Sequence, residues 1–98
     1  MAARDIELAV DHYISEGAVD AALGFIGAIE KAFARIGRHP AAGSTRYAES
    51  LNLPGLRSWV LATFPYVVFY QDRGDHIDVW RVLHSHVDIP AHMQDSAP

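Results

Sequence analysis

Apolar residues in the first part of the chain recur at intervals of three and four, the spacing of an amphipathic helix. The first stripe contains Ile6, Ala9, Val10, Tyr13 and Ile14, with Asp5 and other polar residues largely on the opposite side. The second stripe is longer and contains Ala22, Phe25, Ile26, Ile29, Phe33 and Ile36. Gly17 lies between them, where a left-handed helix end favours glycine. The pattern predicts an antiparallel hairpin of two helices, over residues 3–16 and 19–38.

The periodicity changes after residue 40. Residues 41–50 follow neither a helical nor a strand period, so they are expected to be a surface linker. Alternating, β-branched and aromatic residues then predict three strands between Leu56 and His84, joined by short turns. Short turns between successive strands favour an antiparallel meander. Residues 89–98, which include Pro90 and several small residues, are expected to be a frayed tail.

These elements predict an α+β fold: an N-terminal antiparallel helical hairpin packed on a three-stranded antiparallel sheet. The 98 residues are expected to form a single domain, 1–98. Two helices cover only one face of such a sheet. Val60, Val68 and Val82, or else their neighbours, are therefore expected on an uncovered face, and this apolar excess predicts a partner protein.

Charge is distributed unevenly. Residues 1–30 contain one arginine and six acidic residues, whereas residues 31–57 contain five cations and one glutamate. The net charge of −4 argues against direct nucleic-acid binding, which depends on many cations that neutralise phosphates. The basic middle suits an acidic protein partner, although a solvated helix end and loop would have the same composition. Cysteine is absent, which excludes disulfides and thiolate chemistry, and the chain has no signal or membrane segment, so a cytoplasmic location is expected.

Histidines concentrate near the C-terminus. His84, His86 and Asp88 alternate, so on an extended segment they would share a face and could bind a divalent metal. Their spacing matches no known metal site, and solvent-facing or hydrogen-bonded histidines are the default interpretation. No metal and no cofactor are expected.

A metal-free ribonuclease is a second chemical option. Such an enzyme needs a general base, a general acid and cations for the phosphate. Arg57, Tyr70, Arg81 and His84 could fill these roles if their side chains converge. Nothing in their spacing requires convergence, and arginines on strands are more often rim or ion-pair residues. Catalysis therefore stays open, with a non-catalytic protein favoured.

Several segments, in this order along the chain, resemble the ParE branch of the RelE/ParE toxin superfamily. They are Asp5–Glu7, Asp11–Ile14, Phe25–Glu30, His39–Gly43, Leu56–Arg57, Phe64–Tyr70 and Arg81–His84. Each segment alone is a weak signal, but the ordered set spans about residues 5–88.

The resemblance implies a toxin of a type II toxin–antitoxin system that inhibits DNA gyrase and is neutralised by a ParD-like antitoxin in a hetero-oligomer. The alternatives are a ribosome-dependent mRNA endonuclease of the RelE type and a non-toxic remnant that still binds the antitoxin. ParE members offer no hydrolytic residues to carry over, so no catalytic residue is assigned. By position, Arg57, Arg81 and His84 match the recurring pattern of the family. These three residues, together with Tyr70 and His86, are expected on the surface that faces the antitoxin or the target.

Two features depart from the family pattern. Relatives begin with a strand before the first helix, and this first strand is missing here, so an open sheet edge is expected. An antitoxin tail could add a strand to that edge and lay an amphipathic helix on apolar surface. The chain is also acidic, whereas many family toxins are basic.

Overall fold

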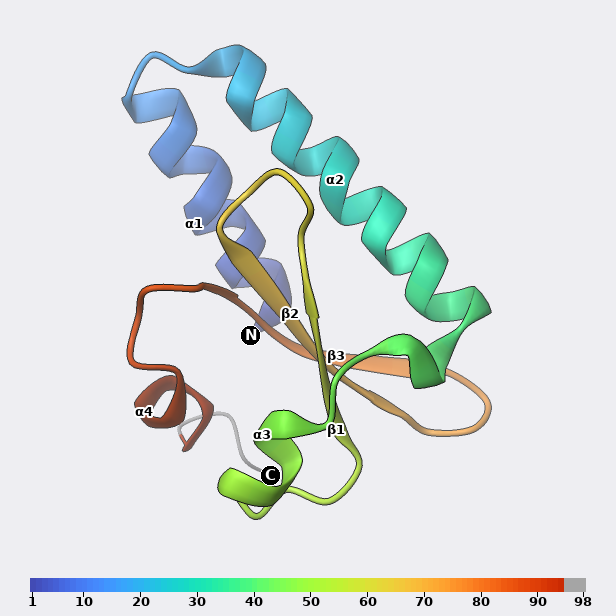
Figure 1. The fold of residues 1–98 in the computed structure, drawn as a ribbon. Coiled ribbons are helices and arrows are strands. Elements are labelled where there is room, and N and C mark those ends of the chain that lie inside the picture. The colour runs from blue at the N-terminus through green and yellow to red at the C-terminus, as the bar shows by residue number, and fades with distance from the viewer. Residues whose placement is uncertain (95–98) are drawn as a thin grey trace.

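The computed structural model describes residues 1–94 of the chain, drawn as a ribbon in Figure 1. Its elements, in chain order, are α1 (Ala2–Ser15), α2 (Val19–Arg38), η1 (Pro40–Ala42), α3 (Arg46–Ser50), β1 (Leu56–Val60), β2 (Tyr66–Asp72), β3 (Ile77–His84) and α4 (Ile89–Gln94). The predicted helical hairpin and the α+β class are confirmed. Within this described part, no helix has the length and apolar character needed to cross a membrane.

The three strands form an antiparallel sheet in the order β1-β2-β3, which confirms the predicted meander. Trp59 of β1 lies opposite Val68 of β2, and Val68 lies opposite Val82 of β3. The register between β2 and β3 shifts between Phe69 and Tyr70. β2 is the central strand and is buried from Tyr66 to Gln71.

The helical hairpin covers one face of the sheet. Phe25 and Ile29 of α2 pack there with Val68 in a shared hydrophobic core. Burying each large apolar side chain stabilises the fold by roughly 1.5–3 kcal/mol. The expected stripe is wrong at Ile26, which is 36% exposed, and Ala32 is buried instead. Ile26 follows Phe25 directly and therefore points about 100° away around the helix.

The opposite face of the sheet is covered by α3 and α4. Phe69 and Leu83 pack there against Ile89 and Met93 of α4, and Met93 is completely buried. From α3, the ring of Tyr47 lies 5.3 Å from that of Phe69, in an edge-to-face arrangement. Figure 1 shows both short helices at the end of the molecule away from the α1–α2 connection. A second, smaller core therefore occupies the face that was expected to be open.

Three sequence-based expectations are corrected by these short helices. Residues 41–50 contain η1 and α3 in place of a plain linker, residues 89–94 form α4 in place of a frayed tail, and the second face is covered. Each helix is too short to repeat a helical period. In the sequence, α3 and α4 are each marked by one apolar pair spaced four residues apart. The pair is Tyr47 with Leu51 for α3 and Ile89 with Met93 for α4. The rest of the expected tail, residues 95–98, lies outside the described residues.

Candidate functional site

Arg81 on β3 is buried together with Asp5 of α1. Its Nε donates to Asp5 Oδ2 at 2.7 Å, and its Nη2 donates to Asp5 Oδ1 at 2.8 Å, the forked geometry of a strong arginine–carboxylate pair. The same carboxylate accepts the backbone N–H of Val82 at 2.9 Å. Arg81 Nη1 also donates to the carbonyl oxygen of His92, at 3.1 Å. One guanidinium thus joins α1, β3 and α4.

The burial of Asp5 corrects its expected position on the exposed side of the first helix. Asp5 lies four residues before Ala9 and therefore shares its buried face. An unpaired buried carboxylate would be strongly unfavourable, but the guanidinium and the N–H of Val82 satisfy it. The partner lies 76 positions along the chain, a separation that helical periodicity cannot detect.

Arg57 and Tyr70 together hold the segment that follows α2. The Tyr70 hydroxyl donates to the carbonyl oxygen of Pro40 at 2.7 Å and accepts the N–H of Gly43 at 3.0 Å. Arg57 Nη1 donates to the carbonyl oxygens of Ala41 and Gly43, at 3.1 and 2.8 Å. Burial raises the pKa of Tyr70, so the hydroxyl keeps its proton well above neutral pH. A side chain at Gly43 would overlap this hydroxyl, which explains the glycine there.

His84 and His86 lie together where β3 ends. His84 Nδ1 accepts the backbone N–H of His86 at 3.1 Å, so the proton of a neutral His84 ring is on Nε2. The two rings meet edge to face with their centroids 5.2 Å apart. The Tyr66 ring also lies 5.2 Å from the His84 ring, and burial raises the pKa of Tyr66.

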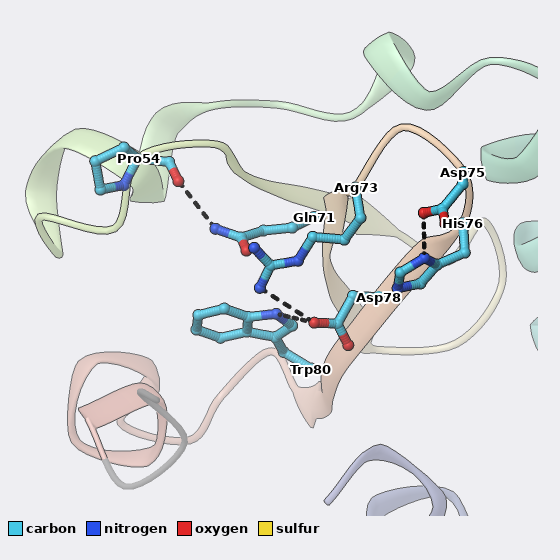
Figure 2. Close-up of polar contacts among 7 residues, drawn as sticks. All are labelled: Pro54, Gln71, Arg73, Asp75, His76, Asp78 and Trp80. Atoms are coloured by element: carbon cyan, nitrogen blue, oxygen red, sulfur yellow. Dashed lines mark hydrogen bonds and ion pairs between the residues drawn. The ribbon is translucent and has the colours of Figure 1, made fainter.

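The remaining C-terminal histidines are elsewhere. His76 Nδ1 lies 2.7 Å from Asp75 Oδ1 in the exposed β2–β3 turn (Figure 2), and this hydrogen bond lowers the pKa of Asp75. His92 Nδ1 lies 2.8 Å from the carbonyl oxygen of Asp88. In residues 1–94, no three histidine or carboxylate side chains are grouped so as to hold a metal ion.

The five candidate residues therefore occupy three places. Arg57 and Tyr70 face one another across β1 and β2, Arg81 binds Asp5, and His84 and His86 form the turn after β3. Most of their polar atoms bind backbone atoms or Asp5. The contacts of Arg57, Tyr70 and Arg81 hold the fold together, whereas the side chain of His86 is exposed and contacts the His84 ring.

A more accessible cationic feature lies beside α2. A groove of about 490 Å³ runs between α2 and the β1–β2 connection, floored by small residues such as Gly27 and Ala28. Lys31 and Arg35 line it, and the Arg35 guanidinium lies 5.7 Å from the centre of the Trp59 ring. Among the described residues, neither cation pairs with a carboxylate. Lys31 and Arg35 are therefore accessible cations of the basic middle, and Arg46 on α3 is also exposed.

The β2–β3 hairpin carries another polar cluster, shown in Figure 2. Asp78 Oδ2 accepts hydrogen bonds from Arg73 Nη2 at 3.3 Å and from Trp80 Nε1 at 3.1 Å. Gln71 Nε2 donates to the carbonyl oxygen of Pro54 at 2.9 Å, which ties β2 to the turn before β1. The contacts of Asp78 thus lie within the hairpin, and the Gln71 contact joins the hairpin to a neighbouring turn.

Residues 1–89 match the model of a protein family described as the ParE toxin of the type II toxin–antitoxin system parDE. The chain belongs to the ParE toxin family. The resemblance predicted from the ordered segments is thereby confirmed, and the ParE fold here is the helical hairpin on a three-stranded sheet.

A solved structure of a chromosomal ParDE toxin–antitoxin system from P. aeruginosa is similar to this ParE family member. The TM-score is 0.68, and the likeness covers 85% of this chain and 86% of that chain at 22% sequence identity. At this identity the likeness establishes the shared fold. No curated protein matches the chain.

Proposed function

We propose that this ParE toxin inhibits DNA gyrase and does not cleave RNA. Gyrase is the target that the ParE resemblance implies. A non-catalytic mode is supported by the hydrogen bonds that candidate catalytic side chains already make within the fold. Tyr70 and Arg81 are buried and bound to backbone atoms or to Asp5, and Arg57 Nη1 binds two backbone carbonyl oxygens, so these atoms already have partners within the fold. Cleavage of RNA needs an acid and a base free to move protons at the reacting oxygens.

Inducible expression in cells tests this proposal. We expect growth arrest with loss of negative supercoiling in a reporter plasmid and with intact transcripts. The variant His86→Ala removes an exposed imidazole and should arrest growth as the wild type does. Arrest with cleaved transcripts and normal supercoiling would instead establish the ribonuclease. No arrest, with antitoxin binding retained, would establish a binding remnant.

The antitoxin is proposed to add a strand to the outer side of β3. Within residues 1–94, β3 has a neighbouring strand only on the β2 side. An open edge presents N–H and C=O groups that a second chain can pair with. The Val82 N–H on this side is already bound by Asp5, so a new strand would pair beside that position.

Hydrogen exchange of the chain with and without its co-expressed antitoxin can locate this contact. We expect stronger protection of the amides of β3 than of those of β1, whose outer side is already paired where Ser58 exchanges two hydrogen bonds with Ser44. Protection restricted to α1 and α2 would contradict strand addition and would leave the toxin assignment intact.

Lys31 and Arg35 are proposed to bind acidic residues of the antitoxin, because Arg57 and Arg81 already bind groups within the fold. Lys31→Glu with Arg35→Glu should weaken the complex. Arg73→Glu, in the β2–β3 hairpin, should change affinity little. Equal effects of the two changes would show that the attraction is non-specific.

A further inference from the structure

The solvent-facing side of α2 carries a stripe that the core beneath the hairpin does not use. Its members recur at alternating steps of four and three, which keeps them on one side along the whole helix. They are Asp20, Gly24, Gly27, Lys31, Ala34 and Arg38, all of them exposed or half-exposed. The stripe thus has an acid at one end, two cations in its second half, and small residues between them.

Gly27 is unexplained by contacts within the chain. Glycine destabilises a helix interior relative to alanine. A Cβ at Gly27 would meet nothing within 4 Å, whereas a Cβ at Gly24 would lie 3.2 Å from Phe64. Glycine on a helix surface allows a second backbone to approach closely. Gly27 is therefore suited to a helix that packs against α2 from outside.

The stripe is complementary to itself when a second copy lies antiparallel. A two-fold axis at position 29 places Asp20 opposite Arg38, since both are equally far from that position. The same axis places the two small residues Gly24 and Ala34 opposite one another and leaves room over Gly27 for the stem of Lys31. A parallel pairing would instead place like charges together, which is unfavourable.

We propose that the free chain forms a two-fold homodimer through antiparallel packing of α2 against α2 of a second copy. The complementary charges along the stripe favour a second copy of the chain as the partner. Leu23, which is 63% exposed beside the stripe, gains apolar contact in the dimer. A helix of 20 residues is only about 30 Å long, so the dimer is weak and sensitive to salt. The dimer proposal does not depend on DNA gyrase being the target. Because Gly24, Gly27 and Lys31 also line the groove, dimerisation and occupancy of that groove exclude one another.

Sedimentation velocity of the full chain across a dilution series tests the charge pairing. We expect a concentration-dependent dimer that Asp20→Lys weakens by about tenfold or more, because two symmetric attractions become repulsions. Adding Arg38→Asp to Asp20→Lys should restore it. Asp11→Lys makes the same charge change at an exposed site on α1 and should leave the dimer intact. A chain that stays monomeric throughout, or a dimer that Asp20→Lys does not weaken, would overturn the proposal.

Gly27→Ala separates dimerisation from folding. The added methyl improves helix propensity and meets nothing in the monomer, so the melting temperature should rise while the dimer weakens. Gly37→Ala also meets nothing and lies outside the stripe, so it should leave the dimer unchanged. Equal dimerisation of the Gly27→Ala variant and the wild type would contradict close approach at this position.

Discussion

The two faces of the sheet are buried by different means. On one face, α1 and α2 supply 14 and 20 residues and a core that includes Phe25, Ile29 and Ile36. On the other face, α3 and α4 have five and six residues, and α4 is held mainly by Ile89 and Met93. Arg81 connects the two arrangements, since it binds Asp5 of α1 and the backbone of α4.

This difference indicates how stability is distributed. Isolated helices shorter than about 12–15 residues are marginal in water, so α3 and α4 depend on the sheet for their structure. The helical hairpin brings several turns of buried side chains and should be lost only when the whole domain unfolds. The second face should instead open locally, at a lower free energy.

Phe25→Ala should have the largest effect on the hairpin face. Phe25 is completely buried and contacts the rings of Tyr66 and Phe64, so its removal leaves a cavity. We expect a loss of about 4 kcal/mol in the free energy of unfolding, measured by urea denaturation. Val60→Ala, at a site 65% exposed, should lose little. Similar losses for the two variants would mean that the hairpin does not form the main core.

Asp5→Ala should rank next, because it removes one partner of the buried pair that joins both faces. We expect a loss of about 3 kcal/mol in the free energy of unfolding, chiefly from leaving the Arg81 guanidinium buried without its carboxylate. Adding Arg81→Met should recover much of the loss, since an apolar replacement removes the uncompensated charge. A double variant no more stable than Asp5→Ala would contradict this explanation.

Met93→Ala should act on the second face alone. We expect a loss of about 2 kcal/mol, at the low end for a buried methionine, because the short helix can detach from the sheet. Hydrogen exchange should accelerate in α4 and stay unchanged in β2. Leu8→Ala, at a half-exposed site on α1, is the matched control. Faster exchange in both α4 and β2 would show that the two faces unfold together.

The parts of the fold that could be predicted from the sequence are those with several periods of pattern. The stripe on α2 spans the whole helix, and the strands are alternating, β-branched or aromatic over several residues, so both can be predicted. Tyr47 with Leu51 and Ile89 with Met93 offer one period each, which a loop can match by chance. The roles of the site residues cannot be predicted in the same way, because a polar residue with a long-range partner cannot be distinguished in sequence from one that faces solvent. Asp5 and Arg81 pair across the chain, and only the fold brings them together.

Tyr70→Phe tests how much the Tyr70 hydroxyl stabilises the segment that joins α2, on the hairpin face of the sheet, to α3, on the opposite face. Its hydroxyl binds Pro40 and Gly43, between the end of α2 and the start of α3. We expect a loss of about 1 kcal/mol in the free energy of unfolding at neutral pH, with faster exchange of the Gly43 amide. Tyr13→Phe removes a hydroxyl that makes no hydrogen bond to residues 1–94, and it should lose less.

The effect of Tyr70 also has a pH dependence whose sign follows from burial. Burial raises the pKa of Tyr70 in the folded chain, so the folded state holds the phenolic proton more tightly than the unfolded state does. The contribution of Tyr70 to stability is therefore fully present below the pKa of an unfolded tyrosine, near 10, and is lost as the pH rises through the folded value. Tyr70→Phe cannot lose this contribution, so the stability difference between variant and wild type should narrow above pH 10. A difference that stayed constant through that range would mean that the Tyr70 hydroxyl is not buried in its contacts with Pro40 and Gly43.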